Sequence, residues 1–422
     1  MEVKPASKCV GNKSLSVDAT SRSLKNCPAC SVSSTEAKFI LADFIEIFGV
    51  QHFFSVDMCK NCGLIFSKKR TINENIYGVD FDVEKEHGHQ CQLLKTIDEN
   101  TWNYEIKKIQ SEEIFKHSPD KNEIKYLEIG ASDGTLFRIT QKKFLLDRRT
   151  LTGTLVESSG AAEPCENIDG CCVISSSIHD VEVFENAPFD IIVMSHCLEH
   201  FEEPRKLLAK LIKILKPDGI IYIEVPDGPR NVQSIATPLS YYHLSDFNTI
   251  NLQILMQEAG FTIISVNLRD EYPGLRIIAK KQNKIKRSSF TCFDRKKSIS
   301  ISLKTIDEWN KKKSNLFNKF SKKKLEGNIL VYGVGAHTVA LMKQYPELLK
   351  DTRISFSDSN FRIKTFLNKN VLKPEEINFT EFDHVLISSY AYQNKIEEFL
   401  VNLGCEKKKL YKFYDRVFSY VI

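Results

Sequence analysis

One short stretch, residues 126–134, constrains the fold of this chain more than any other. It reads Tyr-Leu-Glu-Ile-Gly-Ala-Ser-Asp-Gly, an apolar run that ends in a turn framed by Gly130 and Gly134. The next segment, residues 135–139, has the apolar spacing of a helix start. Glycine permits a tight turn and the close approach of a ligand because it has no Cβ. This strand–turn–helix junction predicts a nucleotide-like ligand at the carboxyl end of a parallel strand.

Two acids beside the turn indicate which ligand it favours. Glu128 precedes Gly130, and Asp133 precedes Gly134. The glycine spacing departs from the G-x-G-x-x-G pattern of dinucleotide sites, and negative charge disfavours a pyrophosphate. S-adenosylmethionine carries a sulfonium, an ammonium and a ribose diol but no phosphate, so the acids favour it as the cofactor.

Strand-like and helix-like segments alternate along the centre of the chain. Apolar runs predict strands over residues 151–157, 172–177, 189–196, 219–225, 262–267 and 275–280. Helical spacing predicts helices over residues 97–114, 205–215 and 248–260. The alternation predicts an α/β fold with a doubly wound parallel sheet that ends in two further strands. Cys171 and Cys172, in the third strand, are expected to be buried hydrophobes.

Polar residues close several of these strands, at the edge of the sheet where a ligand crevice opens. Glu157 ends the second strand about twenty residues after the turn, where an acid can hold a ribose diol. A helix cap or a surface acid is the alternative. Ser177 ends the third strand, where it can bind an adenine amino group, and Ser195 and His196 end the fourth.

The glycine turn and the sequence Leu198-Glu199-His200 after the fourth strand resemble motifs of the class I S-adenosylmethionine-dependent methyltransferases. The resemblance covers residues 126–280. It implies a seven-stranded methyltransferase sheet with S-adenosylmethionine as its cofactor. The residues that we expect to bind the cofactor are Glu128, Gly130, Asp133, Gly134, Glu157, Ser177, Ser195 and His196.

Two Cys-x-x-Cys pairs near the N-terminus predict a structural zinc site. They are Cys27 with Cys30 and Cys59 with Cys62. Each tight turn aims two thiolates at one point, and four thiolates complete a tetrahedron that leaves no open position on the metal. Residues 39–56 can form a hairpin between the pairs. Four free thiols are the alternative.

A four-cysteine segment before the central domain, and a second nucleotide-binding-like domain after it, resemble the plan of the sugar C-methyltransferases. These enzymes act on nucleotide-linked deoxysugars. The plan implies a small zinc-binding domain, a methyltransferase domain and a C-terminal α/β Rossmann-like domain. We expect the corresponding residues to be 25–75, 76–280 and 327–422, with a flexible tail over 1–24 and a basic linker helix over 281–326.

The candidate catalytic residues follow from the same resemblance. In that family a histidine matching His200 and a later Tyr-x-Glu-His cluster line the active site. The later cluster here retains its histidine as His243, but Tyr242 replaces the glutamate and Ser240 the tyrosine. This departure leaves carbon or oxygen open as the methylated atom.

An acceptor atom must lose a proton, and histidine is a base of near-neutral pKa. We therefore expect one of the two histidines to be the base and the other to bind the acceptor, with Tyr241 or Tyr242 donating to, or orienting, a sugar oxygen. Helix-start and packing roles are the alternatives for the histidines.

The charge distribution and the cysteines limit the partners. Residues 280–324 carry sixteen basic and three acidic residues, a local charge of +13, so with a total of +5 the remainder is negative. This pattern does not suit a general nucleic-acid binder. Twelve cysteines without an export signal or a long apolar segment indicate a cytoplasmic protein with no membrane partner. We expect a small-molecule acceptor, a nucleotide sugar or glycan precursor. The sequence leaves the oligomeric state open.

A second glycine turn keeps two other functions open. Gly333 and Gly335 follow an apolar run, but Thr338 stands where a third glycine would complete a dinucleotide fingerprint. A nicotinamide-dependent oxidoreductase that uses this turn is one alternative. A non-catalytic, zinc-dependent binding module is the other, although residues 27–62 lack the basic, aromatic face of a nucleic-acid contact.

Overall fold

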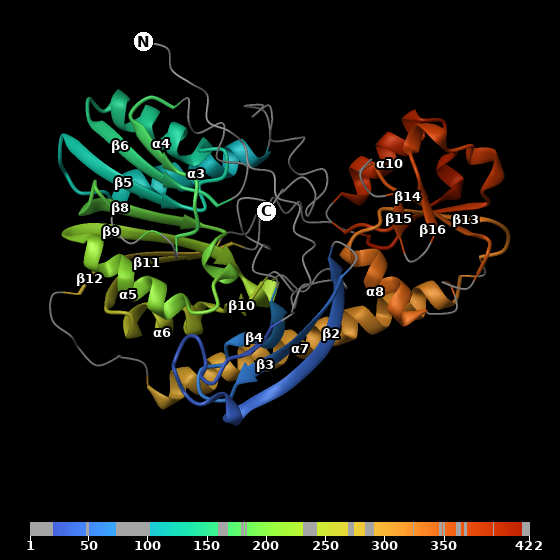
Figure 1. Ribbon diagram of the computed structural model, residues 1–422, viewed down its shortest axis with the longest axis horizontal. Coiled ribbons are helices and arrows are strands. Elements are labelled where there is room, and N and C mark those ends of the chain that lie inside the picture. Colours follow the sequence, from blue (N-terminus) through green and yellow to red (C-terminus); the bar gives the residue numbers. More distant parts are fainter. Residues whose placement is uncertain are drawn as a thin grey trace, which may run out of the picture.

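Three β-sheets and the helices packed on them make up the computed structural model (Figure 1). The described residues are 20–47, 50–72, 102–158, 168–178, 181, 184–230, 243–268, 274–282, 291–323, 325–345, 348, 351–359, 364–366, 369–390 and 392–415. Among them, no helix combines the length and the apolar character that crossing a membrane requires.

The central sheet has seven strands in the order β11-β12-β9-β8-β5-β6-β7. The strands are β5 (Glu123–Ile129), β6 (Thr150–Val156), β7 (Cys171–Ile174), β8 (Phe189–Ser195), β9 (Leu215–Pro226), β11 (Phe261–Leu268) and β12 (Gly274–Lys281). Strands β5 to β9 run parallel, and β12 pairs antiparallel with both β9 and β11. The order reverses direction beside β5, so the carboxyl ends of β5 and β8 meet where a ligand crevice is expected.

Helices cover both faces of this sheet, as the predicted doubly wound fold requires. They are α3 (Trp102–His117), α4 (Thr135–Leu146), α5 (Pro204–Ile214) and α6 (Thr249–Glu258). One face buries α3 and α4 through Ile114, Phe137 and Phe144. The other face buries α5 and α6 through residues such as Leu208 and Leu255. The predicted alternation of strands and helices is confirmed, with element ends moved by a few residues.

Two local expectations differ from the structure. Strand β9 begins at Leu215, directly after α5, because Leu215 already pairs with Phe189 across a register shift. The strand was expected from Gly219. Cys172 is exposed and Cys171 is only half-buried, so neither is the expected core residue. Their strand, β7, is the edge of the sheet and has one neighbour only, β6.

An antiparallel sheet carries the cysteine pairs. Its strands are β1 (Thr20–Ser23), β2 (Ala37–Ile47), β3 (Val50–Cys59) and β4 (Ile65–Ile72). Strands β2 and β3 form the expected hairpin. Strand β1 pairs with β4, so the end of the expected flexible tail is a strand. A fifth strand, β10 (Ser245–Asp246), comes from the central part of the chain and also pairs with β4.

One long helix, α7 (Cys292–Ser321), runs from the cysteine sheet to the C-terminal sheet (Figure 1). Ser298 donates a hydrogen bond of 2.6 Å to the carbonyl of Cys62, and Ser302 donates one of 2.6 Å to Gly63. Gly63 has a φ of +75°, and a Cβ there would lie 2.8 Å from the backbone of Ser298. One face of this basic helix therefore packs against the cysteine sheet, whereas the sequence predicted only a linker.

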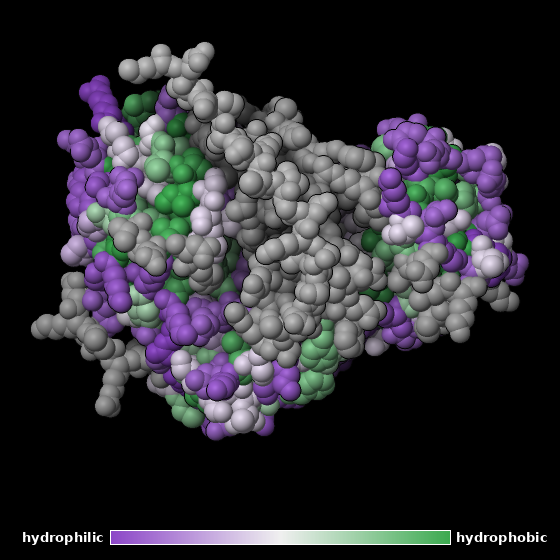
Figure 2. Space-filling view, viewed as in Figure 1, coloured by the Kyte–Doolittle hydropathy of each residue, from purple (hydrophilic) through white to green (hydrophobic). Residues whose placement is uncertain are grey.

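The C-terminal sheet has six strands in the order β15-β16-β14-β13-β17-β18. They are β13 (Ile329–Tyr332), β14 (Ile354–Ser357), β15 (Thr365–Phe366), β16 (Lys369–Leu372), β17 (His384–Ile387) and β18 (Leu410–Lys412), with helices α8 (Ala336–Gln344) and α10 (Gln393–Asn402). The end of α7 joins this core through Phe317 and Phe320. The visible outer surface of this part is mostly hydrophilic (Figure 2).

Candidate active site

The glycine turn between β5 and α4 has the backbone that its sequence predicts. Gly130 has a φ of +73°, and a Cβ there would lie 2.8 Å from Sγ of Cys197. Gly134 also has a positive φ and precedes the first residue of α4. Asp133 Oδ1 accepts from the backbone N of Thr135 at 3.1 Å and from its hydroxyl at 2.7 Å. One oxygen of Asp133 thus binds the first residue of the helix, while Oδ2 is buried without a hydrogen-bond partner among the described residues.

Glu157, at the end of β6, is tied to this turn. Its Oε2 accepts a 2.8 Å hydrogen bond from the backbone N of Ser132. The backbone N of Glu157 donates to Ile174 at the end of β7, so the two strand ends lie side by side. Ser177 follows β7 and is half-buried. The binding of a ribose by Glu157 and of an adenine by Ser177 stays a prediction.

Glu128 is a buried carboxyl group at the end of β5. It is 2% exposed, and its Oε2 accepts a 2.8 Å hydrogen bond from the hydroxyl of Tyr126. Burial raises the pKa of Glu128 to about 7, against the opposing effects of Lys107 and of the tyrosine hydrogen bond. The group is therefore poised between its neutral and charged forms near pH 7 and gains from a cationic ligand.

This pKa predicts how stability depends on pH. Above about 4.5 the unfolded chain releases a proton that the folded chain keeps up to about pH 7. The free energy of unfolding should therefore fall by about 3 kcal/mol across this window as pH rises. Urea unfolding at several pH values measures this decrease in the free energy of unfolding, and Glu128→Gln should abolish the contribution of Glu128 to it. Parallel pH curves for the two proteins would contradict the assignment.

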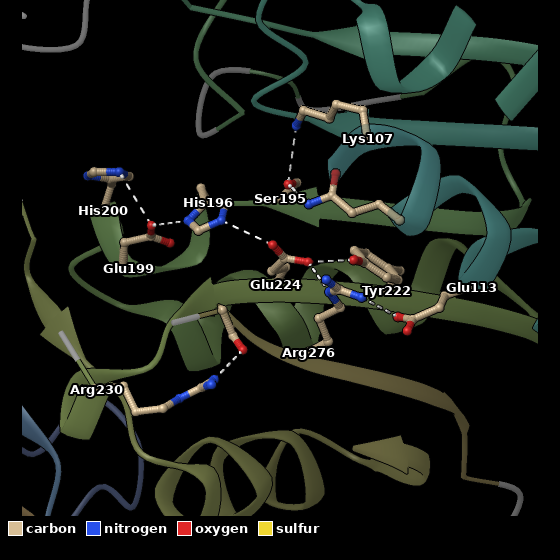
Figure 3. A network of polar contacts seen from close by, with 12 residues as sticks. Lys107, Glu113, Ser195, His196, Glu199, His200, Tyr222, Glu224, Arg230 and Arg276 are labelled. Carbon is tan, nitrogen blue, oxygen red and sulfur yellow. Dashed lines mark hydrogen bonds and ion pairs between the residues drawn. The ribbon is translucent and has the colours of Figure 1, made fainter. Parts of the chain in front are cut away.

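The end of β8 is held by α3, which the sequence did not connect with the site. Ser195 is 7% exposed, and its Oγ accepts from Gln110 Nε2 at 3.1 Å and Lys107 Nζ at 3.4 Å (Figure 3). The next residue, His196, has a φ of +50°, a strained value for a residue with a side chain. Such strain is frequent at functional sites, and here it turns the imidazole toward Glu224.

Glu224 is the centre of a buried charge network. His196 Nε2 lies 3.1 Å from Glu224 Oε1, and the hydroxyl of Tyr222 donates to Oε2 at 2.6 Å. Arg276 Nε also donates to Oε2, and its Nη1 lies 3.0 Å from Glu113 Oε2 (Figure 3). Burial by itself would raise the pKa of Glu224, but His196 and Arg276 hold it well below its usual value. Glu224 is therefore a fixed negative charge behind His196.

His200 and His243, the two candidate bases, lie together. Their ring centroids are 5.1 Å apart at an interplanar angle of 72°. His200 belongs to the short helix η3 (Leu198–His200), and the carbonyl of Glu199 accepts a 2.8 Å hydrogen bond from the backbone N of Leu244. That bond joins the segment after β8 to the segment that carries His243. Tyr241 and Tyr242 lie outside the described residues.

Glu199 is the residue of this cluster that the sequence reasoning missed. It is 1% exposed, and among the described residues neither carboxylate oxygen has a hydrogen-bond partner. Oε1 lies 3.8 Å from His200 Nε2 and 3.9 Å from His196 Nδ1, which is too long for a hydrogen bond (Figure 3). The sequence contained a signal for this role, because Glu199 is an acidic residue between the apolar Leu198 and the candidate base His200.

A second unpaired carboxyl group, Asp246, is close to Glu199. It is 9% exposed, and its Oδ2 has no hydrogen-bond partner among the described residues. Burial raises the pKa of Asp246 well above its usual value, and the charges of Asp227 and Glu199 raise it further. Asp227 is paired with Arg230. In the sequence, charged residues within apolar strands, such as Glu224 and Arg276, were the overlooked signal for this buried polar region.

The four cysteines of the N-terminal pairs form one cluster. Their sulfurs lie within 4.8 Å of one another, and both Cys27–Cys62 and Cys30–Cys59 Sγ distances are 3.6 Å. Four thiolates at about 2.3 Å from a tetrahedral zinc are about 3.8 Å apart, so the cluster fits the ion. Asn61 donates from Nδ2 to Cys30 Sγ at 3.3 Å, an outer contact that zinc thiolates commonly have. The geometry supports the predicted zinc site.

Comparisons with known proteins find similarity to methyltransferases in the central part of the chain. Residues 98–266 match the family model of a methyltransferase domain (Methyltransf_23). Residues 325–411 match the family model described as C2185-like, N-terminal. The central part of the chain is thus similar to methyltransferase domains. The chain is 24% identical over 78 residues to a probable S-adenosylmethionine-dependent methyltransferase of Mycolicibacterium smegmatis. The aligned segment is 18% of this chain and 30% of the relative. The chain thus spans less than a third of that relative's length.

Solved methyltransferases show low similarity. The plantazolicin methyltransferase BpumL in complex with SAH is 15% identical with a TM-score of 0.36, covering 43% of this chain and 87% of its own. An S-adenosylmethionine-dependent methyltransferase from Clostridium acetobutylicum is 10% identical with a TM-score of 0.35, and the alignment covers 47% of this chain and 97% of that methyltransferase. The domain match and the curated relative support an enzyme that uses S-adenosylmethionine.

Proposed function

We propose that this chain is an S-adenosylmethionine-dependent methyltransferase. Its acceptor is a nucleotide-linked sugar, which it methylates at a carbon or an oxygen atom. The observation that carries the proposal is the turn at Gly130, which has a positive φ and lies beside the adjacent strand ends that carry Glu128 and Glu157. These two acids suit the cationic groups and the ribose diol of the cofactor. When bound, the cofactor supplies a methyl group on a positive sulfur, a leaving group that needs no further activation.

The residues of this chain then align the acceptor and remove its proton. His200 and His243 lie side by side beyond the ends of the sheet strands, and both are half-buried. One serves as the base and the other binds the acceptor. Tyr242 precedes His243 in the chain and is proposed to orient a sugar oxygen.

The sugar class is supported by the arrangement of the whole chain. A four-cysteine sheet precedes the central sheet and a second α/β sheet follows it, as in the resemblance to sugar C-methyltransferases. The cytoplasm, where thiols remain reduced, is the proposed location. The oxidoreductase alternative is not favoured, because Thr338 stands where a dinucleotide fingerprint has its third glycine, and its hydroxyl donates a hydrogen bond to the carbonyl of Gly333 in the turn.

Alanine variants of the two histidines test this function. His200→Ala and His243→Ala should each lower turnover by about 10²- to 10⁴-fold, the usual contribution of a general base or acid. Turnover is measured with labelled cofactor against keto- and hydroxy-deoxysugar nucleotides. Binding of S-adenosylhomocysteine, measured by calorimetry, should remain. His384→Ala, in β17 of the C-terminal sheet, is the matched control and should keep full turnover. Full turnover in both test variants would refute the catalytic roles.

A further inference from the structure

We propose that Glu199, His200 and His243 bind a divalent metal ion, separate from the zinc of the cysteine cluster. The inference rests on the proposed function, because the site lies among the residues assigned to the acceptor. Its ligand set, two imidazoles and one carboxylate, is typical of zinc and of other first-row transition metals.

The positions of the ligand atoms fit one ion. One nitrogen from each histidine and one oxygen of Glu199 lie within 4.8 Å of one another. Metal–ligand bonds of about 2.0–2.2 Å place neighbouring ligand atoms roughly 3–3.5 Å apart. His200 Nε2 and Glu199 Oε1 are already 3.8 Å apart, so small side-chain rotations bring this pair to the spacing that one ion requires.

The burial of Glu199 is an independent reason for a cation. A carboxylate that is removed from water costs several kcal/mol unless hydrogen bonds or a charge compensate it. Glu199 is 1% exposed, and neither oxygen has a hydrogen-bond partner among the described residues. Figure 3 shows its carboxylate between His196 and His200. Because both imidazoles are beyond hydrogen-bond distance, the carboxylate is placed to bind an ion rather than to orient a ring.

The surrounding charge points the same way. Asp246 is a second buried carboxyl group, and its Oδ2 also has no hydrogen-bond partner among the described residues. The nearest basic residues along the chain are already paired, Arg205 with Glu258 and Arg230 with Asp227.

A metal ion here changes how the proton leaves the acceptor. With two imidazole ligands and one carboxylate, the ion keeps an open position for an acceptor hydroxyl and lowers the pKa of that hydroxyl. The hydroxyl gives its proton to solvent, and the oxygen then forms a bond to the methyl carbon. The carbon–sulfur bond breaks with its electron pair going to sulfur. His200 and His243 then promote proton loss as metal ligands, which replaces the base and acceptor-binding roles given to them above, and the acceptor atom is oxygen.

Metal stoichiometry of the full chain tests this site without using activity. After reconstitution with Zn²⁺ or Co²⁺ and removal of excess metal, mass spectrometry should find two ions per chain. His243→Ala and the isosteric Glu199→Gln should each bind one ion, while His384→Ala keeps two. With Co²⁺, the thiolate charge-transfer absorption of the cysteine site should be unchanged in all three variants, which shows that the cysteine sheet is intact, and equal melting temperatures show that the central domain is folded.

The possible outcomes separate this inference from the proposed function. One ion in the unaltered protein, with no change in His243→Ala, overturns the metal site. Loss of turnover in the histidine variants would then still support a histidine base. Two ions that fall to one in both test variants, without methyl transfer to any sugar nucleotide, would support the metal site and contradict the proposed acceptor.

Discussion

Replacing Cys62 by serine should abolish the predicted zinc site and unfold the N-terminal sheet. Cys62 is fully buried in the four-cysteine cluster, and a structural zinc contributes about 10–16 kcal/mol of apparent binding free energy in small zinc domains. The effect should extend beyond the cluster. Ser298 of α7 bonds the carbonyl of Cys62, and β10 pairs with β4 of the same sheet. We therefore expect the central domain to lose stability as well.

Metal analysis and thermal unfolding of Cys62→Ser measure both parts of this prediction. The matched control is Cys172→Ser, an exposed cysteine at the edge of the central sheet, which should keep its metal and its melting temperature. If the unaltered protein and Cys62→Ser hold the same amount of metal and melt at the same temperature, Cys62 is not a metal ligand and the predicted zinc site is wrong.

Replacing Arg276 by methionine should cost about 3–5 kcal/mol of unfolding free energy, because it leaves buried Glu224 without its cation. Arg276 is 1% exposed and Glu224 is fully buried, so water cannot compensate the lost ion pair. Arg276 also contacts Glu113 of α3, the helix that holds Ser195 through Gln110. Since Glu224 also contacts His196, the same change should weaken binding of S-adenosylhomocysteine.

Urea unfolding measures the loss of stability, and calorimetry measures the loss of ligand binding. Lys304→Met, which removes an exposed ion pair with Glu308, is the control and should unfold close to the unaltered protein. Adding Glu224→Gln to Arg276→Met should recover part of the stability, since the stranded charge is then gone. A loss no larger than that of the control would mean that Glu224 does not depend on Arg276.

Local patterns predicted the parts of this fold that depend on neighbouring residues. The turn at Gly130 needs a positive φ and an absent side chain, and both requirements are visible in the sequence. The hairpin between the cysteine pairs and the alternating central elements were predicted for the same reason. Element ends were less certain, as at β9, where pairing of Leu215 with Phe189 decides where the strand begins.

Exposure within a strand was not predictable from residue type. Cys172 has the character of a core residue, but its strand is at the edge of the sheet. The packed face of α7 was also hidden, because Ser298 and Ser302 are polar and their partners lie more than two hundred residues earlier in the chain. Their hydroxyls are buried only because the backbone at Cys62 and Gly63 comes close to the helix.

The sequence by itself determined the class of fold, the glycine turn with its flanking acids, and the cysteine pairs, because each of these follows from residues close together in the chain. Only the tertiary structure decided that His200 meets His243, that Arg276 lies beside Glu224, and that Glu199 is buried without a hydrogen bond. These relations join segments that are far apart in the chain. Burial and charge at such a point are set by what packs around it, which a local pattern does not record.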